Sequence, residues 1–98
     1  MEGHELSAKV RPTHAWLGDT LQGLTDFTPA DQIHIDPRVE GSRITFNVRV
    51  PATDLGKVIG KQGRTARALR VLLAARGRRD GLSYGLDIEN HPDQETTA

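Results

Sequence analysis

Val58-Ile59-Gly60-Lys61-Gln62-Gly63-Arg64 organises the rest of this chain, because two glycines bracket two polar residues between two helical segments. Apolar spacing predicts these helices over residues 53–59 and 64–76. Glycine lacks a side chain and adopts conformations closed to other residues, so a ligand could approach the main chain of such a turn directly. The N-terminus of the second helix would favour a phosphate, through its unpaired N–H groups and positive dipole end. A plain corner between two helices is the alternative explanation of the same spacing.

Outside this turn, three segments alternate between apolar and polar residues, as half-buried strands do. They are residues 32–36, 43–50 and 82–88. The segment from Pro37 to Ser42 contains Gly41 and predicts a turn that would let the first two strands pair antiparallel. A weaker helical pattern over residues 13–26 precedes the strands. The order is therefore αββααβ, and one three-stranded sheet with helices packed on one face buries every apolar stripe, which predicts an α+β fold.

The length of 98 residues accommodates one small domain. Residues 1–11 and 91–98 lack apolar periodicity, so we expect flexible tails on either side of a domain over residues 12–90. The chain contains no cysteine, which excludes disulfides, thiolate nucleophiles and cysteine-based zinc sites. Neither a signal peptide nor a membrane-spanning run is recognisable, so we expect a cytoplasmic protein.

The net charge of zero conceals a strong asymmetry along the chain. Residues 49–79 hold nine of the 13 lysines and arginines and a single acidic residue, Asp54, so this block carries +8 and the remainder −8. Arginines on a helix are often only a solvated face. Here the positive block coincides with the glycine turn, which favours a polyanionic ligand.

The run from Val50 to Arg70 resembles the Ile-Gly-x-x-Gly signature of KH domains, which bind single-stranded nucleic acid. The αββααβ order resembles the bacterial type II arrangement of that fold. The run is also similar to the small stand-alone bacterial KH proteins of the KhpA, or YlqC-like, family. The resemblance is strong over residues 50–75 and agrees in element order and length over residues 12–90.

This resemblance implies a single-stranded RNA-binding protein without enzymatic activity or cofactor, acting as an RNA chaperone or post-transcriptional regulator. In KH domains the Gly-x-x-Gly loop clamps about four nucleotides by their backbone. By position, the phosphate contacts would come from Gly60, Lys61, Gln62 and Gly63. Supporting positive charge would come from Lys57, Arg64 and Arg67, and the groove for the bases from Val58, Ile59 and Val48.

A second apolar stripe lies on the helix predicted over residues 64–76, formed by Ala68, Val71 and Ala75. The core face of that helix is predicted to consist of Ala66, Leu69, Leu72 and Leu73, with the stem of Arg76. We expect the helix over residues 13–26 to cover the stripe, and a subunit contact is the alternative. The family resemblance implies a homodimer or pairing with a larger KH-containing protein of the Jag/EloR type, in control of cell elongation, cell shape and wall synthesis.

Other functions fit the sequence less well. A phosphate-binding P-loop requires four residues between its glycines, and Gly56 and Gly60 enclose three. A DNA-binding helix-turn-helix is disfavoured by the alternating strands on both sides of the turn. The histidines share no metal-ligand spacing, and no nucleophile pattern predicts a catalytic site. An adaptor for a partner protein, with RNA binding incidental, remains the alternative function.

Overall fold

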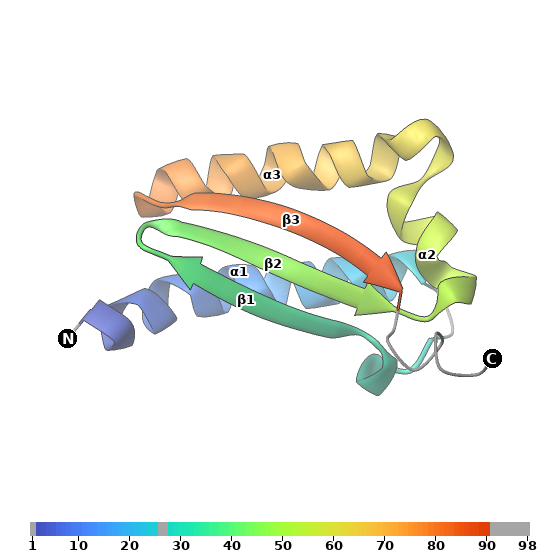
Figure 1. Ribbon diagram of the computed structural model, residues 1–98, viewed down its shortest axis with the longest axis horizontal. Coiled ribbons are helices and arrows are strands. Elements are labelled where there is room, and N and C mark those ends of the chain that lie inside the picture. The colour runs from blue at the N-terminus through green and yellow to red at the C-terminus, as the bar shows by residue number, and fades with distance from the viewer. Residues whose placement is uncertain (1, 26–27, 91–98) are drawn as a thin grey trace.

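The computed structural model of the chain describes residues 2–25 and 28–90 (Figure 1). The elements follow one another as α1 (Glu2–Leu24), the 3-10 helix η1 (Ala30–Gln32), β1 (His34–Glu40), β2 (Arg43–Val50), α2 (Ala52–Ile59), the 3-10 helix η2 (Lys61–Gly63), α3 (Arg64–Asp80) and β3 (Ser83–Asn90). Apart from the two short 3-10 helices, this confirms the predicted αββααβ order and the α+β class.

The three strands form one sheet, in which β2 lies between β1 and β3. β1 and β2 pair antiparallel across a tight turn that contains Gly41. β2 and β3 run parallel, so the chain must cross over between them, and α2 and α3 form this crossover. The apolar residues of β2 are fully buried at every second position, namely Ile44, Phe46, Val48 and Val50. This alternation turns one face of the sheet toward the core.

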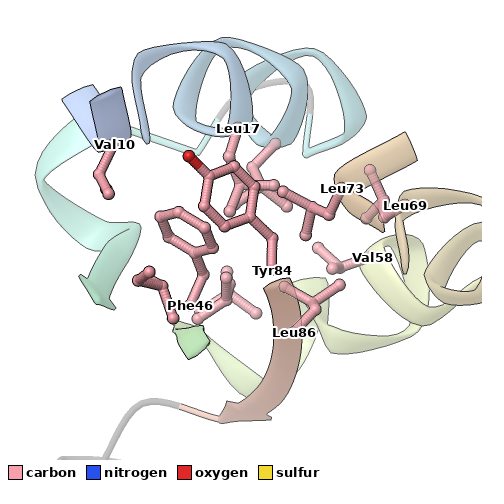
Figure 2. Close-up of a cluster of buried hydrophobic side chains, with 12 residues drawn as sticks. Val10, Leu17, Phe46, Val58, Leu69, Leu73, Tyr84 and Leu86 are labelled. Atoms are coloured by element: carbon pink, nitrogen blue, oxygen red, sulfur yellow. The ribbon is translucent and has the colours of Figure 1, made fainter. Parts of the chain in front are cut away.

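One hydrophobic core joins the two long helices to the sheet (Figure 2). Leu17 and Leu21 of α1 and Leu73 of α3 are fully buried in it. Phe46 and Tyr84 meet edge to face on neighbouring strands, with their ring centroids 5.5 Å apart. The core therefore fixes α1 and α3 against the sheet through contacts from all three elements.

Arg76 adds a polar link between α3 and α1. Its Nε donates a hydrogen bond to Thr13 Oγ1 at 2.9 Å. Its guanidinium carbon lies 5.0 Å from the centroid of the Trp16 ring, which is within the range of a cation–π interaction. The stem of Arg76 was predicted to face the core side of its helix. The contacts of the guanidinium with Thr13 and Trp16 of α1 give a physical reason for that orientation.

The first helix is longer than predicted. α1 begins at Glu2, so the structure differs over residues 2–11 from the expected flexible tail, and the helix starts well before Thr13. Val10, one turn before Thr13, belongs to the core at 8% exposure, and its burial favours extending the helix. Pro12 lies inside α1, where proline removes one backbone hydrogen bond. Burial of the preceding turn therefore outweighs the local cost of a proline.

The first strand also extends beyond its predicted end. We expected a turn from Pro37, yet β1 continues to Glu40 and Pro37 pairs with Phe46. β1 lies at the edge of the sheet, where a residue without an N–H group is tolerated. The turn is therefore shorter than expected, at Gly41 and Ser42.

The outer face of α3 is not covered by α1, contrary to expectation. Val71 is 63% exposed, and Ala68 and Ala75 are exposed as well. Leu72, predicted as a core residue, is 50% exposed. The buried face of α3 is narrower than the predicted one because it is confined to positions three or four residues apart, namely Ala66, Leu69, Leu73 and Gly77.

At Gly77, α3 approaches the chain that follows it. A Cβ atom there would lie 2.7 Å from the carbonyl oxygen of Leu82, so only glycine permits this approach. The predicted tail over residues 91–98 lies outside the described residues. Within the described ranges, no helix is both long and apolar enough to span a bilayer.

Candidate nucleic-acid interface

Gly60 ends α2 in a conformation that requires glycine. Its φ of 80° and ψ of 168° lie in a region essentially restricted to glycine. Space imposes the same requirement, because a Cβ at this position would lie 2.3 Å from Thr65 Oγ1 and 2.8 Å from the Thr65 backbone nitrogen. The first glycine of the loop thus permits close packing of α3 against the end of α2.

The Gly-x-x-Gly loop is a tight turn with its own hydrogen bonds. The N–H of Gly63 donates to the carbonyl oxygen of Gly60 at 3.0 Å, and the N–H of Arg64 donates to the carbonyl oxygen of Lys61. Gln62 (φ 58°) and Gly63 (φ 74°) both adopt left-handed backbone conformations. Lys61 and Gln62 are exposed, so the loop, which lies between α2 and α3 (Figure 1), presents two polar side chains to solvent.

Two arginines from the start of α3 fold back onto this loop. Arg64 Nη2 donates to Gln62 Oε1 at 3.1 Å, and Arg67 Nη2 donates to the carbonyl oxygen of Gln62 at 3.2 Å. Both arginines are exposed. The structure therefore brings the predicted charged residues of α3 next to the predicted loop residues.

Lys57 reaches the surface from the last turn of α2 and is held by Asp54. Lys57 Nζ lies 3.8 Å from Asp54 Oδ1, and the Lys57 side chain is 49% exposed whereas that of Asp54 is 8% exposed. Asp54 lies in the first turn of α2, where a carboxylate interacts favourably with the helix dipole. It also accepts a hydrogen bond from Thr28 Oγ1. The single acidic residue of the basic block is thus buried and structural.

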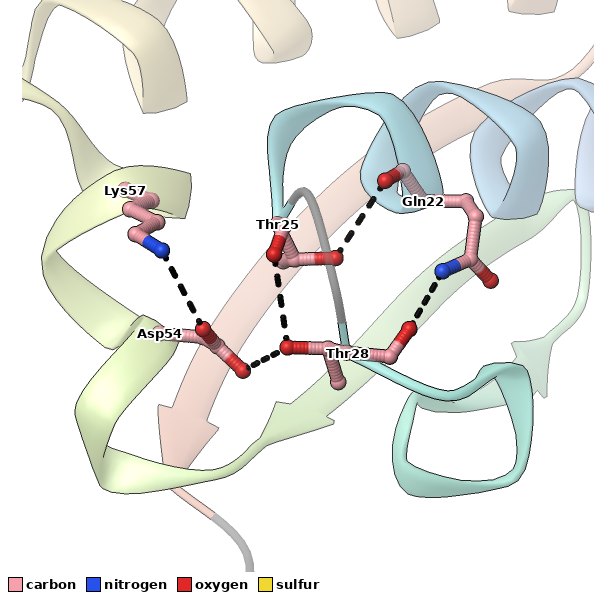
Figure 3. A network of polar contacts seen from close by, with 5 residues as sticks. All are labelled: Gln22, Thr25, Thr28, Asp54 and Lys57. Atoms are coloured by element: carbon pink, nitrogen blue, oxygen red, sulfur yellow. Dashed lines mark hydrogen bonds and ion pairs between the residues drawn. The ribbon is translucent and has the colours of Figure 1, made fainter.

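The bond to Thr28 is part of a network that ties α2 to the end of α1 (Figure 3). Gln22 Nε2 donates to the carbonyl oxygen of Thr28. Thr28 Oγ1 lies 3.4 Å from the carbonyl oxygen of Thr25, and Thr25 Oγ1 donates to the carbonyl oxygen of Gln22 at 3.4 Å. This network fixes the N-terminal end of the helix whose other end carries the loop.

Two of the residues predicted to line the groove are buried. Val58 and Val48 have no exposed surface and belong to the hydrophobic core, so in this structure neither side chain presents a surface to a base. Ile59, next to Gly60, is partly exposed. Adjacent residues of a helix point to different sides. Because Val58 points into the hydrophobic core, Ile59 lies nearer the surface.

Thr28, Gln22 and the structural role of Asp54 were not predicted from the sequence. Asp54 carried one usable signal, since it lies three residues after Pro51 at a predicted helix start. Thr28 carried none, because its contact with Asp54 joins residues 26 positions apart, and Gln22 enters the network only through Thr28. Within residues 2–25 and 28–90, no three histidine, aspartate or glutamate side chains lie close enough together to hold a metal ion.

Comparisons with known proteins agree with this geometry. The family described as KhpA/KhpB, KH domain, matches residues 19–88. This range includes the loop, the helices α2 and α3, and nearly all of the three-stranded sheet. The chain is 51% identical over 51 residues to a protein of Aquifex aeolicus named RNA-binding protein KhpA, covering 51% of this chain and 65% of that protein. It is 51% identical over 49 residues to the protein of the same name from Treponema pallidum, covering 50% of this chain and 60% of that one.

A more distant relative with the same name, from Listeria monocytogenes, is 36% identical over 58 residues, covering 59% of this chain and 76% of that protein. No solved structure matched the chain. The family match extends over more than half of the chain, and the αββααβ order with a β1-β2-β3 sheet is that of a type II KH fold. The chain therefore belongs to the KhpA/KhpB KH-domain family.

Proposed function

We propose that this protein binds single-stranded RNA through the loop of residues 60–63, as a cytoplasmic binding protein without catalytic activity. The observation that carries the proposal is the conformation of the loop. Gly60 and Gly63 have positive φ angles and carry no side chain, and the loop that they flank lies between the end of α2 and the start of α3. Its relatives from Aquifex aeolicus and Treponema pallidum are named RNA-binding proteins. A KH loop of this kind clamps the backbone of about four nucleotides.

The surrounding charges support a phosphate ligand. Lys61 is exposed within the loop, and Arg64 and Arg67 lie against it from α3. Lys57 lies at the adjoining end of α2. Exposed cations that neutralise phosphates make binding dependent on salt. We assign the bases to the surface next to Ile59, the partly exposed apolar residue beside the loop.

The test must keep the loop intact. Substituting Gly60 would force a side chain into Thr65, so loss of binding would report a distorted loop. Lys61→Asp with Gln62→Asp leaves both glycines in place and alters only exposed side chains. Aspartate also tolerates the left-handed conformation of position 62 better than most residues. We expect this double variant to bind a short single-stranded RNA at least roughly tenfold more weakly, because it replaces attraction by repulsion of phosphate.

A matched control is Ala8→Asp with Lys9→Asp, which carries the same change in net charge on exposed residues in the first half of α1, at the opposite end of the molecule (Figure 1). We expect this control to change the dissociation constant less than about threefold, since exposed charges far from the ligand are screened. Fluorescence anisotropy at several salt concentrations measures both variants. Equal effects of the two variants would refute binding at the loop.

We further propose a second surface on the outer face of α3, through which the chain forms a homodimer or pairs with a larger KH-containing protein of the Jag/EloR type. Val71 and Leu72 are exposed at 63% and 50%, and Ala68 and Ala75 continue the stripe along the helix. An apolar stripe of this kind is typical of a protein contact. The observation also favours the adaptor function, in which partner binding dominates and RNA is incidental.

Sedimentation at increasing protein concentration tests this surface. Val71→Asp with Leu72→Asp should shift the protein toward the monomer, whereas Val39→Asp, at another exposed apolar residue, should not. A wild-type protein that stays monomeric at high micromolar concentration would refute the homodimer. Retention of RNA affinity by the α3 variant would separate the two surfaces.

In the cell, we propose a post-transcriptional or RNA-chaperone role linked to elongation, shape and wall synthesis, on the strength of the family resemblance. Crosslinking followed by sequencing of bound RNA tests it, with the loop variant as the control. Transcripts enriched with the wild type and lost with the loop variant would be direct targets. Equal recovery by both proteins would contradict an RNA role.

A further inference from the structure

Gln62 is the one non-glycine residue with a positive φ among the described residues. Its φ of 58° and ψ of 24° are left-handed helical values. This conformation is unfavourable for a residue with a Cβ atom, which lies too close to the following carbonyl oxygen. Some contact must therefore offset the cost if the loop is to keep this shape before any ligand arrives.

The contact is made by Arg67. Its Nη2 donates to the main-chain oxygen of Gln62 at 3.2 Å, five residues back along the chain. The same Nη2 atom lies 4.0 Å from the place where a Cβ of Gly63 would be, so the guanidinium also borders the second left-handed residue. Arg64 contacts Gln62 as well, but through the side-chain oxygen, which does not fix the backbone. Arg67 is thus the arginine that bonds to the strained peptide.

We propose that Arg67 is a positioning residue, which keeps Gln62 left-handed and the loop ready for RNA. This inference rests on the proposed RNA-binding function and changes the role that the sequence gave Arg67, which was to supply charge to phosphates. A charge-assisted hydrogen bond to a carbonyl is stronger than a neutral one. The bond commits an N–H group of the guanidinium to the Gln62 carbonyl, so Arg67 contributes through the shape of the loop.

A double-substitution cycle separates positioning from phosphate contact. Arg67→Gln removes the cation, and Gln62→Gly removes the backbone cost that Arg67 offsets. We expect Arg67→Gln alone to weaken RNA binding by roughly five- to tenfold, as expected from the cost of one left-handed residue. In the Gln62→Gly background, the same substitution should change the affinity by less than about twofold. The slope of log affinity against log salt should stay unchanged by Arg67→Gln.

The matched control is Arg78→Gln, an exposed arginine on the same helix far along α3 from the loop, which should leave the affinity unchanged. The proposal is overturned if Arg67→Gln lowers the slope of log affinity against log salt by about the value of one phosphate contact and weakens RNA binding equally with glutamine or glycine at position 62. If the wild type binds no RNA, the proposed function fails. The positioning role of Arg67 is then tested by measuring the backbone conformation of Gln62 in the free protein. NMR coupling constants report φ of Gln62, and a left-handed Gln62 retained in Arg67→Gln would overturn the positioning role.

Discussion

At the scale of single residues, the two glycines flanking the loop are not equivalent. Gly60 is constrained by both its backbone angles and the nearby Thr65, whereas Gly63 has a left-handed φ, and a Cβ atom added there would meet only Arg67 Nη2, at 4.0 Å. The sequence analysis treated both as positions where a ligand backbone approaches. The structure adds that Gly60 also has a packing role that no local pattern reveals.

We predict that Gly60→Ala destabilises the protein by roughly 2 kcal/mol or more, because its Cβ would overlap Thr65 and its φ would be strained. The matched control is Gly56→Ala, inside α2 with nothing within 4 Å of the added Cβ, which should stabilise by about 0.5–1 kcal/mol. Urea unfolding followed by circular dichroism measures both. Equal effects of the two substitutions would contradict the packing at Gly60.

Tyr84 gives a prediction about pH. Burial raises the pKa of Tyr84 to about 12, and the hydrogen bond of 2.6 Å from its hydroxyl to Asp80 Oδ2 adds to the shift. The same hydrogen bond lowers the pKa of Asp80. Because the folded pKa of Tyr84 exceeds the ordinary value of about 10, this group stabilises the fold below pH of about 10. That contribution is lost as the pH rises through about 12.

The chain contains one tyrosine, so phenolate absorbance reports this group alone. We expect a titration midpoint near 12 in the native protein and near the ordinary value of about 10 in denaturant. Asp80→Asn should lower the native midpoint, because it removes the carboxylate that accepts the hydrogen bond. A native midpoint close to that of the denatured chain would show that Tyr84 is neither buried nor bonded in this way.

At the scale of elements, the sequence predicted the type and order of the α-helices and strands and the bounds of β2, but not the bounds of α1 and β1. The alternation of apolar and polar residues was sufficient to predict β2, because one face of this strand is fully buried. α1 and β1 both run past a proline, at Pro12 and Pro37, where a local rule ends an element. In α1 burial of the preceding turn extends the helix, and in β1 the edge position removes the penalty for a missing N–H.

The early part of α1 gives a prediction at this scale. Val10 is 8% exposed and belongs to the core, although it lies in the region where the sequence predicted a tail. Val10→Asp should destabilise the protein by about 2 kcal/mol or more, because it buries a charge without a partner. Lys9→Asp, one residue earlier and exposed, should change stability by less than about 0.5 kcal/mol. Similar unfolding midpoints for the two variants would show that this turn does not pack on the core.

The helix that carries the loop shows why part of the site could not be predicted. The residues of the loop and its charges were predictable, since they lie within a short continuous run. The groove was not, because Val58 is buried by tertiary packing in the core shared with the sheet and the long helices. The anchoring of α2 by Thr28 and Asp54 also depends on a distant contact.

At the scale of the whole molecule, the net charge of zero is the sum of a positive block, residues 49–79, and a negative remainder. The block of residues 49–79 folds into the end of β2, α2, the loop and most of α3, so Lys57, Lys61, Arg64 and Arg67 gather around the loop, whereas Arg76, Arg78 and Arg79 lie toward the other end of α3. Its one acidic residue, Asp54, is buried and bonded. The account therefore places a localised cationic region on an otherwise acidic protein. Its central claim is that RNA binds at the loop that joins α2 to α3.

The most direct test is an NMR titration of the isotope-labelled protein with a short single-stranded RNA. The account predicts that the largest amide shifts occur over residues 57–67, with Gly60 to Gly63 at their centre. It predicts small shifts over the first half of α1, which Figure 1 shows at the opposite end of the molecule. Largest shifts on the outer face of α3 or along β1, with an unperturbed loop, would contradict the account.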